Sequence, residues 1–112
     1  MPAGEFIRAK RKELGLTASA LAKKSHLAVT TISRLERDTM PPPREYNILN
    51  IAKALEIEPD MLFAKFNKPP QELTDLYCKN PRYRPLLRAL DTLSKEDFDS
   101  IFDIVMQKTK NL

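Results

Sequence analysis

The side chains that most often carry out catalysis are scarce in this 112-residue chain. It has one histidine, His26, and one cysteine, Cys78, which is too few for a zinc site built from histidine and cysteine ligands. The two residues lie in differently composed halves of the chain, which disfavours a cysteine–histidine nucleophile pair. A single cysteine also excludes an internal disulfide, and a reducing compartment is the simplest interpretation.

Motifs that bind phosphate or calcium are missing as well. Gly4 and Gly15 are the only glycines, so the sequence has no glycine-rich phosphate-binding loop. The acidic run Asp97, Asp99 and Asp103 has neither the glycine turn nor the closing glutamate of an EF-hand loop. We therefore expect a protein that is not an enzyme and that has no cofactor and no metal site.

The distribution of charge is compatible with a polyanionic partner. Residues 1–68 contain 12 Lys and Arg against 8 Asp and Glu, a net charge of +4, whereas residues 69–112 contain 7 of each. The basic surplus therefore belongs to the N-terminal part. No apolar run approaches the ~18 residues that span a membrane, and the N-terminus lacks the basic and apolar regions of a signal peptide. We expect a cytoplasmic protein with no membrane partner.

Helical periodicity dominates the elements that must position these charges, and no alternating strand pattern occurs. The sequence therefore predicts an all-α protein. In the N-terminal part, apolar spacing and the positions of glycine and proline predict five helices. Their ranges are 4–14, 18–24, 28–37, 44–55 and 59–66.

Details of these helices follow from single residues. Phe6, Ile7 and Leu14 should face inward from the first helix, and Thr17 should cap the second. The third helix should bury Leu35 together with either Val29 or Ile32.

Residues 69–112 follow a proline-rich boundary at 67–70 and form a helical C-terminal segment. Three helices are predicted there, over 71–79, 85–93 and 95–110, with Ser94 as N-cap of the last one. The last helix has the clearest amphipathic pattern in the chain, because its apolar residues recur at intervals of three and four. They are Phe98, Ile101, Phe102, Val105 and Met106.

The second and third helices are short and separated by a three-residue break, which is the spacing of a helix-turn-helix. In that motif one helix enters the major groove of DNA while the other braces it across the backbone. An extended connection enforced by the prolines 41–43 follows the pair.

Several sequence segments resemble the phage-repressor-like helix-turn-helix domains of the lambda repressor/Cro, XRE-like type. The similar segments occur in the order of that family's first helix, second helix, recognition helix and two closing helices. They are IRAKRKELGLT at 7–17, LAKK at 21–24, TISRLER at 31–37, IAKAL at 51–55 and PDMLF at 59–63. The resemblance covers residues 4–66 and implies a five-helix DNA-binding domain there.

The resemblance also implies which residues contact double-stranded DNA. Four recognition-helix positions would face base edges: Val29, Thr30, Ser33 and Arg34. Arg34 is the strongest candidate for base readout, because a guanidinium bonds a guanine edge bidentately. The methyl groups of Val29 and Thr30 would meet thymine methyls.

Other positions would contact the DNA backbone. Thr17, Ala18 and Ser19 correspond to a helix start that touches a phosphate. Arg44 corresponds to a position that reaches the backbone or the minor groove. A structural ion pair between Arg11 and Glu36 is also implied.

The sequence departs from the family at three positions. Ala18 replaces a glutamine that contacts phosphate or base, so that side-chain contact is absent. His26 and Asp38 replace turn glycines, and both residue types tolerate positive φ better than most.

We predict a transcriptional repressor that binds a two-fold DNA operator as a homodimer. The apolar residues of the last helix would form the dimer interface, or would instead cover the N-terminal domain. Two further hypotheses remain open. The chain is an antitoxin whose residues 69–112 bind a toxin, or it is a protein-interaction module that has lost DNA binding.

Overall fold

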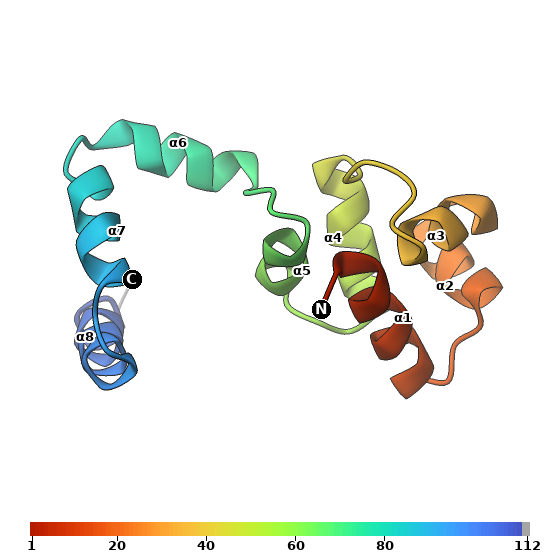
Figure 1. The fold of residues 1–112 in the computed structure, drawn as a ribbon, viewed down its shortest axis with the longest axis horizontal. Helices are drawn as coiled ribbons and strands as arrows, with labels where there is room; N and C mark the ends of the chain where they lie inside the picture. Colours follow the sequence, from red (N-terminus) through yellow and green to blue (C-terminus); the bar gives the residue numbers. More distant parts are fainter. Residues whose placement is uncertain (111–112) are drawn as a thin grey trace. The chain divides into compact units, whose positions relative to one another are not determined.

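A computed structural model describes residues 1–110, and this part of the chain is all-helical (Figure 1). The prediction of an all-α protein is confirmed. The helices are α1 (Ala3–Glu13), α2 (Ala18–Ser25), α3 (Val29–Glu36), α4 (Glu45–Ala54), α5 (Pro59–Lys65), α6 (Gln71–Lys79), α7 (Tyr83–Asp91) and α8 (Lys95–Lys108). They form two compact units, residues 1–71 and a second unit that begins at Glu72. The last two residues of the predicted C-terminal segment, 111 and 112, lie outside the described part.

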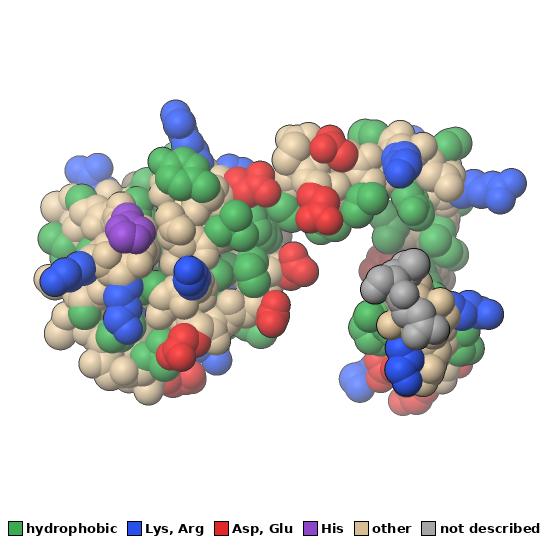
Figure 2. All heavy atoms as spheres, turned by 180° about the vertical axis from the view of Figure 1, so that it is seen from behind, with side chains coloured by type: hydrophobic (Ala, Val, Ile, Leu, Met, Phe, Trp, Pro, Cys, Tyr) green, Lys and Arg blue, Asp and Glu red, His purple; other side chains and the backbone are tan. Residues whose placement is uncertain are grey.

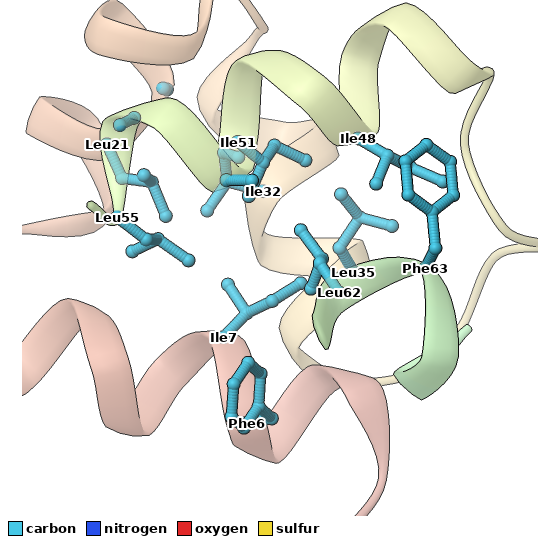
Figure 3. Packing of buried hydrophobic residues seen from close by; sticks show 13 residues of the cluster. Phe6, Ile7, Leu21, Ile32, Leu35, Ile48, Ile51, Leu55, Leu62 and Phe63 are labelled. Atoms are coloured by element: carbon cyan, nitrogen blue, oxygen red, sulfur yellow. The ribbon is translucent and has the colours of Figure 1, made fainter. Parts of the chain in front are cut away.

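The first unit is built around one apolar core. Helix α2 packs on α3 and α4, α1 packs on α3 and α5, and α4 packs on α5. All five helices contribute side chains that point toward a common centre (Figure 3). The largest are Phe6, Ile7, Leu21, Ile32, Leu35, Ile48, Ile51, Leu55, Leu62 and Phe63.

The structure corrects some details of the predicted helices. Leu14 is exposed, because α1 ends at Glu13 and Leu14 lies beyond the helical stripe that faces the core. Of the two alternatives for α3, Ile32 is buried and Val29 is exposed. Helix α7 begins two residues before Pro85, since a proline in the first helical turn removes an N–H that would have no partner there.

Non-glycine residues in the left-handed conformation follow four of the helices. His26, Asp38, Glu56 and Asn67 have φ between 53° and 59° and follow α2, α3, α4 and α5 respectively. The expected left-handed turn at His26 is therefore confirmed, and Asp38 adopts the same conformation. Left-handed residues let the chain leave each helix in a tight turn.

Asp38 also links the end of α3 to the start of α1. Its Oδ1 accepts a hydrogen bond from the Gly4 N–H at 3.0 Å, so this carboxylate caps α1 from a residue far along the chain. A Cβ at Gly4 would lie 2.5 Å from the Leu35 carbonyl oxygen, which explains why a glycine is needed at this crossing.

The residues that connect the two units are anchored to the start of α4. The Lys68 ammonium donates to the carbonyl oxygen of Pro43 at 3.0 Å, and the Gln71 N–H donates to Glu45 Oε2 at 3.4 Å. Pro43 is itself buried. The folded first unit therefore continues past α5 to Gln71.

The second unit differs from the first because none of its described residues is buried. Leu90 and Leu93 are half-buried, and they line a hollow of about 580 Å³ together with Leu87 and Phe98. The predicted cap of α8 is confirmed, since Ser94 Oγ accepts from the Asp97 N–H at 3.1 Å.

No helix of the described residues has the length and apolar character needed to cross a membrane.

Candidate nucleic-acid interface

A buried polar contact stabilises the turn between α2 and α3. Ser25, the last residue of α2, is fully buried, and its hydroxyl donates to the Leu21 carbonyl at 2.7 Å. The Leu27 N–H donates to the Ala22 carbonyl at 2.9 Å across the left-handed His26. These bonds hold α2 and α3 at a defined angle, as a helix-turn-helix requires.

Helix α3 has one buried side and one side open to a ligand. Ile32 and Leu35 anchor its inner side in the core. The predicted base-reading residues lie around the rest of its circumference, where Val29, Thr30 and Arg34 are exposed and Ser33 is half-buried. The structure thus brings all four onto one short helix with a fixed orientation.

Glu36 on α3 is bound by α1. Arg11 Nε and a terminal nitrogen donate to the two Glu36 carboxylate oxygens at 2.8 and 2.9 Å, and the other terminal nitrogen donates to the Leu16 carbonyl at 2.9 Å. The exposed fractions of the Arg11 and Glu36 side chains are 13% and 8%. The hydrogen bond to Glu36 and the attraction of its charge raise the pKa of Arg11, although burial opposes the shift. This pair therefore joins α1 to α3 within the fold.

The other charges at the end of α3 have partners within the chain as well. Arg37 Nε donates to the Ser33 carbonyl at 3.2 Å, and Asp38 accepts from the Gly4 N–H. Within the described residues, the Arg34 guanidinium makes no ion pair or hydrogen bond. Its five donors therefore remain available to a ligand.

The start of α2 presents backbone donors beside exposed side chains. Thr17 Oγ1 accepts from the Ala20 N–H at 3.0 Å, which fixes the helix start. The amides of Ala18 and Ser19 lie in the first turn, where no carbonyl of the helix can reach them. Ala18 packs partly against the core and Ser19 is exposed, so any contact made by Ala18 uses its backbone.

Arg44 lies at the N-cap of α4, directly after the proline run. Its carbonyl oxygen accepts from the amides of Asn47 and Ile48, while its side chain is exposed. Because Pro43 is buried and bound by Lys68, the backbone that presents Arg44 is fixed on both sides.

Sequence analysis missed two features of the surface. Lys24, His26, Asn50, Lys53 and Glu56 line a hollow of about 370 Å³ between the ends of α2 and α4. Figure 2 shows this side, where lysine and arginine side chains lie near the single histidine. The mixed charge of the hollow gives it no clear ligand preference.

On α8, Ile104 is as exposed as the five predicted interface residues and extends their apolar surface.

The described residues contain no group of three His, Cys, Asp or Glu side chains that could hold a metal ion. Exposed lysines and arginines lie on both units, and those of the first unit share it with an outward-facing third helix. This arrangement suits an extended anionic ligand.

Comparison with known proteins identifies relatives of the first unit. Residues 7–62, half of the chain, match the family model described as "Helix-turn-helix". The chain is 42% identical over 59 residues to repressor protein C2 of Salmonella phage P22. The match covers 53% of this chain and 27% of that protein, so the chain spans about a quarter of its relative's length.

Solved structures give the same result. The phage P22 c2 repressor, in complex with a synthetic operator, is 37% identical with a TM-score of 0.54, and the match covers 58% of this chain and 97% of that chain. The SinR–SinI protein complex has a TM-score of 0.53 over 96% of this chain and 98% of the matched chain, but at 23% identity this likeness concerns the fold alone. Residues 7–62 are thus a helix-turn-helix domain of DNA-binding type, and the chain belongs to the phage-repressor-like helix-turn-helix family.

Proposed function

We propose that this chain is a transcriptional repressor that binds a specific double-stranded DNA sequence as a homodimer. The observation that carries the proposal is which side chains of α3 are buried or paired within the fold and which remain free. Its inner side is buried, Glu36 is paired with Arg11, Asp38 accepts from the Gly4 N–H, and Arg37 donates one hydrogen bond to its own helix. Arg34 keeps its donors, so it is the residue of this helix best suited to read a base.

Phosphate contacts would position α3 in the groove. The amides at the start of α2 and the exposed Arg44 are donors of the kind that bind phosphate oxygens. In a two-fold dimer the α3 helices would enter neighbouring major grooves, with half-sites about 10 bp apart. The relative from phage P22 was solved on a synthetic operator, which supports the same mode of binding here.

Selection of bound sequences from a random pool of DNA duplexes tests the proposal. The full chain at about 150 mM salt should enrich a two-fold motif, and affinity should fall with salt with a log–log slope near −5 if it makes about six phosphate contacts. A flat salt response without enrichment would favour an interaction module that has lost DNA binding.

Replacing Arg34 tests its role in base recognition. Arg34→Ala should cost about 1–3 kcal/mol of binding free energy and relax the sequence preference at one position of each half-site. Arg37→Ala is a matched control, because it removes the same charge from a guanidinium that is folded onto its own helix. The control should weaken binding to all sequences alike. An unchanged preference in Arg34→Ala would remove this residue from base recognition.

A different protein is a second candidate partner for residues 72–110. The observation in its favour is that none of these residues is buried. The SinR–SinI complex joins two different proteins, and one of its chains has the same fold as 96% of this chain. Co-purification of a second protein, such as a toxin, with the expressed chain tests this function.

A further inference from the structure

Four residues form a row along one edge of α8. Asp97, Ile101, Ile104 and Lys108 are separated by four, three and four residues, which is the spacing of the contact positions in a coiled coil. Ile101 and Ile104 are 39% and 55% exposed, and Asp97 and Lys108 are exposed as well. The row is therefore an uncovered seam with an apolar centre and one charge at each end.

The adjacent part of α8 is directed toward α7. Phe98 lines the hollow that it shares with Leu87 and Leu90 of α7, and its ring stacks on Phe102 with centroids 6.4 Å apart. The seam lies beside this surface. It is thus available to another chain while Phe98 remains next to its own α7.

The order of residues along the seam identifies the partner. Read in either direction, the seam has a charged residue, two isoleucines and a charged residue of opposite sign. A two-fold axis between Phe102 and Asp103 would place Asp97 of each copy opposite Lys108 of the other, and Ile101 opposite Ile104. A parallel pair would instead place like charges opposite each other.

We propose that α8 pairs antiparallel with α8 of a second copy of this chain, held by Asp97–Lys108 ion pairs on both sides of an isoleucine centre. The proposal rests on the homodimer of the proposed function and gives its geometry. It assigns Ile104 and the two charged residues to the interface together with Ile101, whereas Phe98, which the sequence also placed in the interface, remains beside α7.

The neighbours of the seam are compatible with this pairing. Phe98 and Val105 border it on one side, and the neutral Ser100 and Gln107 border it on the other, so no like charges meet there. Lys95 and Asp99 lie on the far side of the helix and pair with each other at 3.2 Å. Within the described residues, Asp97 and Lys108 make no ion pair, and their charges are available to the second copy.

The second unit also needs a partner to be stable. Its helices have 9, 9 and 14 residues and no buried side chain among those described. Helices of this length are marginal in water without packing, and so small a unit usually needs oligomerisation. A second copy would cover apolar surface on both chains at once.

Charge reversal in the full chain tests the pairing, with self-association measured by sedimentation equilibrium. Asp97→Lys and Lys108→Asp should each weaken the homodimer about tenfold, because two attractive pairs become repulsive. The double variant D97K/K108D restores opposite charges and should regain the wild-type dissociation constant. A mixture of the two single variants should form a heterodimer of near wild-type affinity.

Asp103→Lys is the matched control. It makes the same change of charge on the opposite side of α8 and should leave self-association unchanged. Recovery in the mixture also shows that the single variants fold.

The outcomes separate this proposal from the proposed function. A wild-type dimer that is unaffected by the single variants, or a double variant that stays weak, overturns the α8 pairing but leaves a dimer. A wild-type protein that is monomeric while it binds DNA, or that associates only with a different protein, overturns the homodimer itself. Sequence selection measured on the same samples reports on DNA recognition independently.

Discussion

The two units of this chain are both helical, yet they differ in what their helices bury. Helices α1 to α5 enclose a core to which every one of them contributes, whereas α6 to α8 contain no buried residue in the described structure. Local signals serve both units equally well: Thr17 caps α2 and Ser94 caps α8 in the same way. Helix formation is therefore a poor guide to whether a unit is stable by itself.

The difference also separates two kinds of contribution to function. The first unit uses its core to hold α3 in place, so its surface residues can be exposed without loss of order. The second unit has many large apolar side chains exposed, and we propose that a second chain covers part of them. We infer that the first unit recognises a ligand as a folded body, and that the second becomes ordered by association.

The same isoleucine-to-alanine substitution should have different effects in the two units. Ile32→Ala should lower the unfolding free energy of α1 to α5 by about 3 kcal/mol, because it removes a fully buried side chain, and this loss should not depend on protein concentration. Ile101→Ala should leave α1 to α5 unchanged and reduce protection of α8 in a concentration-dependent manner. Hydrogen exchange resolved by segment measures both.

The opposite result for Ile101→Ala would support the other interpretation of the apolar residues on α8. If Ile101→Ala destabilised α1 to α5 at all protein concentrations, α8 would cover the first unit, which is the second interpretation of its apolar residues. Ile101→Asp, with a larger expected effect on sedimentation, provides a check on the same residue.

Removing one partner of the Arg11–Glu36 ion pair should lower the unfolding free energy more than removing both. Arg11→Met should destabilise the protein by about 3 kcal/mol, since it leaves the nearly buried Glu36 carboxylate without its cation. The double variant R11M/E36L should recover most of this loss, because it removes both charges. Urea unfolding followed by circular dichroism measures the two differences, and equal losses in the single and double variants would contradict this account.

The smallest predicted effect concerns the bond between the end of α3 and the start of α1. Asp38→Ala should cost about 1 kcal/mol by removing the acceptor for the Gly4 N–H. Asp38→Asn keeps an acceptor and tolerates the left-handed conformation, so it should retain most of the stability. The same urea experiment applies, and a full loss in the asparagine variant would mean that the charge matters more than the hydrogen bond.

Much of the fold could be predicted because its signals are local. Proline, glycine and caps mark the ends of the helices, and apolar spacing identifies Leu35 on the inner side of α3. It leaves Val29 and Ile32 as alternatives there, of which the structure buries Ile32. The inward assignment of Leu14 is wrong because apolar character alone does not show where a helix ends. The base-facing positions follow from the family resemblance and remain predictions.

Interactions between distant residues could not be predicted in the same way. The approach of Asp38 to Gly4 depends on how α1 crosses α3, and nothing near either residue indicates it. The availability of Arg34 also depends on tertiary contacts, because Glu36 and Asp38 find their partners on α1. The sequence could place Ile104 on α8. Its proposed position in the interface follows only when the row Asp97, Ile101, Ile104, Lys108 is paired with the same row running in the opposite direction.

The anchoring of Lys68 and Gln71 on the start of α4 has a consequence for protein engineering. A chimera in which this DNA-binding module carries a foreign association domain should be joined after Gln71 and not at the end of α5. A junction at residue 66 would remove the cation that binds the Pro43 carbonyl and loosen the support of Arg44. The choice of junction would thus alter the DNA affinity of the fusion even though no DNA-contacting residue is changed.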